Sequence, residues 1–140
     1  MPTLAGSCHC GAVRVEFETA KHPDAIRPRA CQCSFCRRHG AKTVSDPDGK
    51  LVLYAAPDAL TPYRFATGTL DILLCRTCGS FVAATMENEH GRFGVLNVVG
   101  SRIAELSERE AAPASYEALS AEQRVAGRVG RWTPMEIRSS

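Results

Sequence analysis

The sequence has no hydrophobic run long enough to cross a membrane. A membrane-spanning helix needs about 20 consecutive apolar residues, and the apolar runs of this 140-residue chain are much shorter. The first residues, MPTLAGS, also lack the basic and apolar segments of a secretory signal peptide. We therefore expect a cytoplasmic protein with no membrane partner, in a compartment where disulfides are rare.

The chain also lacks a large excess of charge of either sign. Its 17 Lys and Arg residues and 15 Asp and Glu residues give a formal net charge of +2. Proteins that bind nucleic acids usually carry a strongly basic surface, so this balance predicts no nucleic-acid partner. The sequence shows no internal repeats or low-complexity segments, and a content of 44% hydrophobic and 23% charged residues is typical of a globular protein.

The length and the hydrophobic pattern predict one mainly β domain over residues 1–140, with a core over 6–100 and a tail over 101–140. Short apolar runs separated by Gly, Pro, Asp and Asn are typical of antiparallel strands in a sandwich or an open barrel. The expected strands are residues 12–18, 51–55, 63–66, 70–75, 81–86 and 93–99.

A short helix is expected near the C-terminus. Ser120 followed by Gln123 has the form of a capping box, and Gly127 is a candidate for the helix end. Residues 101–114 are polar and rich in alanine, which indicates a loop with at most a short helical turn. Trp132, the single tryptophan, is interpreted as a packing anchor for the tail.

What the sequence has in quantity is cysteine, and all seven cysteines lie in three tight groups. An odd number of thiols in a reducing compartment argues for metal binding or catalysis rather than a disulfide framework. Thiolates on a tetrahedral zinc ion lie about 3.8 Å apart, and cysteines separated by one or two residues reach this distance easily. In chain order, the groups are Cys8-x-Cys10, Cys31-x-Cys33-x-x-Cys36 and Cys75-x-x-Cys78.

These groups divide most simply into four ligands and three. The first and third groups each precede a glycine at a strand end, so two hairpins can share one closed structural zinc site. The middle group, called the triad below, would then form a second zinc site with one open position, as in catalytic zinc sites. Spacing alone leaves another pairing open, in which Cys33 and Cys36 share an ion with the third group. A redox pair with a spare thiol is a further interpretation of the triad, whereas the groups lack the usual spacing of iron–sulfur ligands.

The order of these motifs resembles the glutathione-dependent formaldehyde-activating enzyme family, which includes centromere protein V. The segments that carry the resemblance are 6–13 (GSCHCGAV), 31–40 (CQCSFCRRHG), 63–64 (YR), 75–80 (CRTCGS) and, more weakly, 97–100 (NVVG). The resemblance implies a zinc-pinned β fold of the β-tent kind. It also implies a structural zinc on Cys8, Cys10, Cys75 and Cys78, and a second zinc on Cys31, Cys33 and Cys36 beside a glutathione site.

The activity that the resemblance implies is that of a carbon–sulfur lyase. Such an enzyme would join glutathione and formaldehyde into S-hydroxymethylglutathione, or act on a related small-molecule thiol adduct. Arg37 and Arg38 directly follow the triad and are candidates to hold the carboxylates of glutathione, although they can equally offset the charge of the thiolates or remain solvated. His39 is interpreted as a surface histidine, with the role of a fourth ligand as the alternative.

Two other functions fit the same cysteines. One is a non-catalytic zinc module that binds a protein partner, and the other is a redox sensor whose triad releases zinc on oxidation. The three are separated by the number of zinc ions held, by the response to glutathione, and by the response to mild peroxide.

Overall fold

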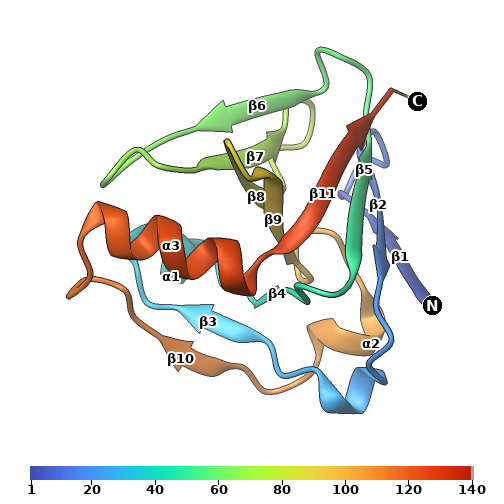
Figure 1. The fold of residues 1–140 in the computed structure, drawn as a ribbon. Helices are drawn as coiled ribbons and strands as arrows, with labels where there is room; N and C mark the ends of the chain where they lie inside the picture. Colours follow the sequence, from blue (N-terminus) through green and yellow to red (C-terminus); the bar gives the residue numbers. More distant parts are fainter. Residues whose placement is uncertain (140) are drawn as a thin grey trace.

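The computed structural model describes residues 1–139 and is mainly β, with a single 11-stranded sheet of branched connectivity (Figure 1). The strands are β1 (Thr3–Ser7), β2 (Arg14–Glu18), β3 (Arg29–Cys31), β4 (Thr43–Val44), β5 (Lys50–Tyr54), β6 (Leu60–Tyr63), β7 (Asp71–Cys75), β8 (Phe81–Asn88), β9 (Gly91–Asn97), β10 (Ala112–Ala114) and β11 (Thr133–Arg138). The helices are α1 (Ser34–His39), α2 (Ala104–Ser107) and α3 (Ala121–Arg131), with a 3-10 turn at Pro23–Ala25. Within the described residues, no helix is long and apolar enough to span a membrane.

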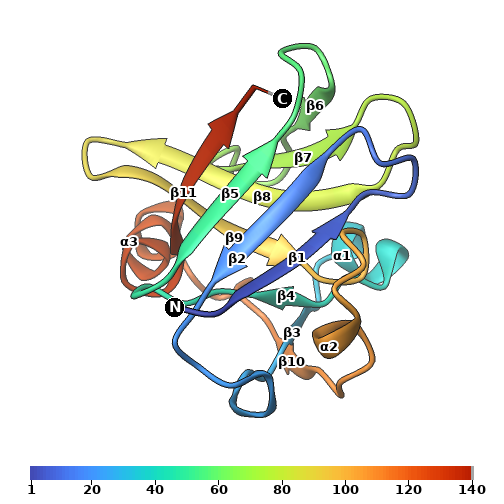
Figure 2. The same ribbon diagram turned by 90° about the vertical axis from the view of Figure 1, so that its right-hand side faces the viewer.

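The strands form two layers that cross each other. One layer has the order β1-β2-β5-β11, and the other contains β6-β7-β8-β9 with β4, β3 and β10 beyond β9. Figure 2 shows the first layer crossing in front of β7, β8 and β9 at a steep angle. In Figure 1, α3 and α1 lie on the flank of the molecule opposite β1 and β2, and Figure 2 shows β4 and β9 between the two helices.

Strand β11 joins the two layers. Its first residues, Thr133 and Pro134, pair antiparallel with β9, and the residues from Met135 onward pair parallel with β5. A strand that changes partners in this way makes a corner between two sheets. The sheet is mixed, because the β5–β11 and β3–β10 pairings are parallel while the others are antiparallel.

The prediction of a mainly β fold with a short C-terminal helix is confirmed, but several boundaries differ. The strand expected at 63–66 lies at Leu60–Tyr63, and five strands that the pattern did not predict are present: β1, β3, β4, β10 and β11. The capping box at Ser120 and Gln123 is formed. Gly127 does not end α3, which continues to Arg131. A single glycine lowers the stability of a helix by about 1 kcal/mol but does not break it by itself.

Two hydrophobic clusters fill the fold. The larger one lies between the two layers and contains Phe17, Leu51, Leu53 and Leu96, all fully buried. The smaller one lies on the flank of α1 and α3 and contains Trp132, which is 6% exposed and confirms the prediction of a packing residue. Gly100 packs so tightly on the carbonyl of Phe81 that any side chain there would clash, which explains the glycine of the NVVG segment.

Asp46 contacts both sides of the corner, through its buried carboxylate on one side and its backbone amide on the other. The Thr19 hydroxyl donates to Oδ2 of Asp46 at 2.6 Å, and the Asp46 amide donates to Oγ1 of Thr133 at 2.8 Å. Burial opposes ionisation of this carboxyl, but the hydrogen bonds from Thr19 and from the amide of Asp48 outweigh it and hold the pKa of Asp46 below its ordinary value. Asp46 therefore connects the end of β2 to the start of β11.

We expect the substitution Asp46→Ala to lower the free energy of unfolding by about 2 kcal/mol, because it leaves buried donors without an acceptor. Chemical denaturation measures this loss. Asp48→Ala is the matched control in the same turn, since the Asp48 side chain is exposed, and it should change stability by less than about 0.5 kcal/mol. Equal losses in the two variants would contradict the role of Asp46.

Candidate metal centre

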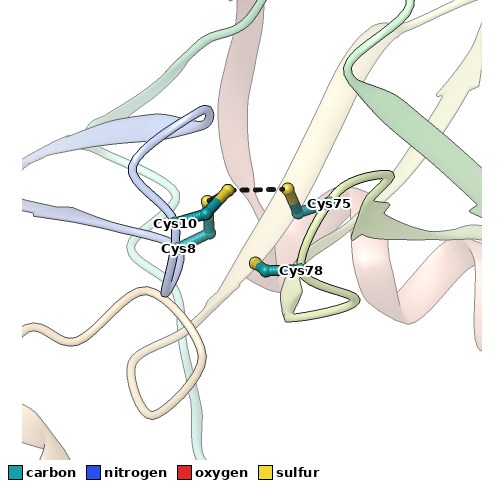
Figure 3. Close-up of side chains that lie close together, drawn as sticks. All are labelled: Cys8, Cys10, Cys75 and Cys78. Carbon is teal, nitrogen blue, oxygen red and sulfur yellow. Dashed lines mark hydrogen bonds between the residues drawn. The ribbon is translucent and has the colours of Figure 1, made fainter.

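Four cysteines from two distant hairpins meet at one point (Figure 3). Their sulfur atoms all lie within 4.8 Å of one another. The Cys8 and Cys10 sulfurs are 3.7 Å apart, and the Cys10 and Cys75 sulfurs are 3.6 Å apart. These separations match the edge of a zinc–thiolate tetrahedron, about 3.8 Å. Cys8, Cys10, Cys75 and Cys78, called the four-cysteine cluster below, therefore suit a zinc ion in both donor type and spacing.

Glycine turns shape both arms of this cluster. Gly11 and Gly79 have φ values of 84° and 76°, which favour glycine because other residues are strained there. The Gly79 amide donates to the Cys75 carbonyl at 2.8 Å, and the Val13 amide donates to the Cys8 sulfur at 3.3 Å. Each tight turn thus brings two sulfurs to one side of the chain, and the Val13 amide stabilises negative charge on the Cys8 sulfur.

The four thiols differ in how readily they ionise. Burial opposes ionisation of Cys78, but hydrogen bonds from the Ser80 side chain and from backbone amides outweigh it and lower the pKa of Cys78 to about 5. Burial raises the pKa of Cys75 to about 11. The cluster can therefore offer a thiolate to an incoming cation at neutral pH, and the cation would then ionise the remaining thiols.

The triad lies at the start of α1 and is built locally. Cys31 ends β3, Cys33 is the N-cap of α1, and Cys36 is in its first turn, with its amide donating to the Cys33 sulfur at 3.3 Å. The three sulfurs lie within 4.8 Å of one another. The side-chain hydrogen bond with Cys36 is the main cause that lowers the pKa of Cys31 to about 6, and the same contact raises the pKa of Cys36.

The grouping of four and three is thus the one that the fold brings together. The alternative, in which Cys33 and Cys36 join Cys75 and Cys78, does not occur, because these pairs belong to different clusters. His39 is exposed and stacks on Phe35 with ring centroids 4.3 Å apart. It is not part of the triad cluster, as expected for a surface histidine. Three thiolates suit zinc and leave its fourth position to another ligand.

A cavity of about 180 Å³ opens next to the triad. Cys31, Cys33 and Cys36 form part of its wall, and most of the remaining wall is apolar. Strands β7, β8 and β9 contribute Ile72, Ala84 and Val95, while α3 and the residues around it close the other side. A partly enclosed apolar space with a few reactive groups in its wall is the usual form of a small-molecule site.

Four arginines also line this cavity. Arg29 comes from β3, and Arg124, Arg128 and Arg131 come from α3. Among the described residues, none of the four forms an ion pair with a carboxylate. The same wall also holds Glu117 and the triad thiols, and the Cys31 thiolate interacts with the charges of Arg124 and Arg128, so the positive charge of the wall is offset only in part.

The most deeply placed of these arginines is Arg128, which is 8% exposed. Its guanidinium donates to Oγ1 of Thr69 at 2.7 Å and lies over the Trp132 ring, 5.3 Å from the centroid. Burial is the main cause that lowers the pKa of Arg128 to about 10, and the charges of Arg124 and Arg131 add to it. At neutral pH Arg128 remains charged.

Comparison with known proteins agrees with this geometry. The family model of the glutathione-dependent formaldehyde-activating enzyme matches residues 3–117, which include all seven cysteines. The chain belongs to this family. Among solved structures, a Rhodobacter sphaeroides protein is similar in fold, with a TM-score of 0.50 and 28% identity over 98% of this chain and 100% of that one.

The match to the glutathione-dependent formaldehyde-activating enzyme family ends before α3. Arg124, Arg128 and Arg131 thus lie beyond the matched residues, and the sequence-based prediction missed them. Their spacing of four and three residues was an available signal, because it places all three on one helix face. Arg37 and Arg38 are exposed and do not line the cavity, and their contact with glutathione stays a prediction.

We expect the purified family member to contain about two zinc ions per chain. Cys10→Ser should lower this to about one and reduce the melting temperature strongly, because a closed zinc site contributes directly to folding. Cys33→Ser should also lower zinc to about one, with a smaller effect on melting. Metal analysis and thermal unfolding measure both effects, and each variant serves as the control for the other. Loss of both ions in the Cys33→Ser variant would contradict two independent sites.

Proposed function

We propose that this protein is a zinc-dependent carbon–sulfur lyase that joins a small thiol, glutathione in the first instance, to an aldehyde such as formaldehyde. The observation that carries the proposal is the cavity at the triad. A closed structural site needs no adjacent space, whereas three thiols in the wall of a cavity leave room for a substrate sulfur beside them.

Zinc held by the triad would supply a Lewis acid that favours the thiolate form of a substrate thiol. The three cysteines hold and orient that centre, and the cavity walls limit the access of water. In the reaction itself, the substrate thiolate adds to the carbonyl carbon, so a carbon–sulfur bond forms and the carbonyl π bond breaks. The proton released by the thiol is recovered by the aldehyde oxygen, which gives a hydroxyalkyl thioether without any oxidant or reductant.

The arginines of the cavity wall support an anionic substrate. Glutathione carries two carboxylates, and a guanidinium pairs with a carboxylate through two parallel hydrogen bonds. Nε of Arg124 donates to the Tyr116 and Leu119 carbonyls, which fixes the side chain while its other nitrogens remain available. The Arg131 guanidinium lies over the Tyr116 ring, 5.2 Å from the centroid. We assign the carboxylate contacts to Arg124 and Arg131.

The same features favour an enzyme over the two other functions. A protein-binding module would present an exposed apolar surface, whereas Ile72, Phe81 and Val95 beside the triad face a concave space. A redox sensor needs an accessible thiolate of low pKa, which the partly exposed Cys31 supplies, but it has no need of an adjoining cavity with a cationic wall.

We expect Cys36→Ser to reduce the rate of S-hydroxymethylglutathione formation by at least about 100-fold, because the triad would no longer hold its metal correctly. Nuclear magnetic resonance with isotope-labelled formaldehyde separates this rate from the spontaneous reaction. Gln32→Ala is the matched control, since Gln32 lies between two triad cysteines with its side chain exposed. A folded Cys36→Ser protein with full activity would overturn the proposal.

We expect Arg124→Gln and Arg131→Gln each to raise KM for glutathione about tenfold while kcat changes little, because each loses a charge-assisted hydrogen bond to substrate. The same assay with Arg37→Gln and Arg38→Gln tests the contact predicted from the sequence. A rise in KM in the latter pair alone would move the carboxylate site from α3 to α1.

A further inference from the structure

The cavity beside the triad is larger and more apolar than formaldehyde requires. Among the hydrophobic side chains of its lining are six from five different segments of the chain. They are Phe65, Ile72, Phe81, Ala84, Val95 and Trp132. Formaldehyde adds a single carbon atom and a hydroxyl group to a thiol, so it would leave most of this wall without contacts.

The volume indicates the size of the missing group. An apolar cavity of about 150 Å³ in another protein binds benzene, and the space here is about 180 Å³. Pockets that enclose drug-sized ligands have volumes of about 300–1,000 Å³. The cavity is therefore suited to one ring or one branched chain, and the peptide part of a thiol such as glutathione would remain at its mouth.

The wall that closes this space is a feature of the C-terminal segment. Residues from Leu119 to Trp132 form one side of the cavity, whereas the family match covers residues 3–117. The family description, which names formaldehyde, thus rests on residues that do not include this wall. The apolar lining thus combines both parts of the chain, because Trp132 lies beyond the match and the other five residues named above lie within it.

The apolar and the cationic residues of the wall would bind different parts of a substrate. The apolar residues offer contacts to a hydrocarbon group, and Arg124 and Arg131 offer contacts to carboxylates. The triad thiols lie in the same wall, so a substrate sulfur bound there would share the cavity with both kinds of group.

We propose that the substrate is a thiol adduct whose sulfur-bound carbon carries an apolar group of about the size of a phenyl ring, and that this group occupies the cavity between α3 and β7–β9. This inference rests on the proposed function. It specifies that the aldehyde of that reaction is aromatic or branched aliphatic. The chemistry is unchanged: the carbon–sulfur bond forms as the carbonyl π bond breaks, and the thiol proton goes to the aldehyde oxygen.

Binding of three stable compounds to the zinc-loaded protein tests this assignment. Glutathione, S-methylglutathione and S-benzylglutathione share the same carboxylates and differ only at the sulfur. Titration calorimetry should show S-benzylglutathione binding at least about tenfold more tightly than S-methylglutathione, because the phenyl group is removed from water.

Filling the cavity supplies the second arm of the test. Ala84 lines the cavity from β8, and Ala84→Leu should remove the advantage of the benzyl compound while leaving the affinity for S-methylglutathione nearly unchanged. Ala83→Val is the matched control, because Ala83 is the next residue of β8 and packs in the larger cluster on the other face. If Ala84→Leu does not fold, Ala84→Val makes the same change on a smaller scale.

The outcomes are distinct. Equal binding of the benzyl and methyl compounds by the unmodified protein would overturn this inference but leave the proposed function intact. Equal weakening of both compounds by Ala84→Leu would place the peptide part of glutathione in the cavity and also overturn it. Failure of all three compounds to bind would remove the proposed function together with the inference.

Discussion

The structure depends on the meeting of four thiols that lie far apart in the sequence. The contact between the Cys10 and Cys75 sulfurs joins residues separated by 65 positions. It fastens the turn after β1 to the turn between β7 and β8, and so connects the two crossing layers at one end (Figure 3). A metal at this point stabilises the fold because the unfolded chain has no preformed site for it. At the other connection between the layers, β11 passes from one to the other, held by Asp46.

The triad depends much less on the rest of the fold for its own geometry. Cys33 and Cys36 are positioned by the N-cap of α1, a local hydrogen bond within four residues. What the fold adds is the environment of these thiols. Strands β7, β8 and β9 provide an apolar floor, and α3 provides a wall with three arginines on one face. A cluster of thiols becomes a candidate reaction site because it lines a cavity that has both apolar and cationic parts.

The strands that the sequence predicted are those with clear alternation or a continuous apolar run, such as β2, β7 and β8. β11 alternates apolar and polar residues from Met135 to Arg138, a signal that the prediction overlooked. Three other missed strands are short, since β3 and β10 have three residues each and β4 has two. Such segments are strands because a neighbour offers hydrogen bonds to them, and their own propensity is weak. Because the neighbouring strand and not the segment's own sequence decides the pairing, two of the pairings are parallel, although the pattern suggested antiparallel sheets throughout.

The sequence by itself determined the chelating groups, since cysteines one or two residues apart converge on one ion in almost any fold. It also determined the start of α3, because a capping box at Ser120 and Gln123 is a local structure. Only the tertiary structure decided which groups combine, because several pairings satisfy the same spacing. It alone brought Arg124, Arg128 and Arg131 to the triad, since contacts across about 90 residues depend on chain topology and not on local pattern.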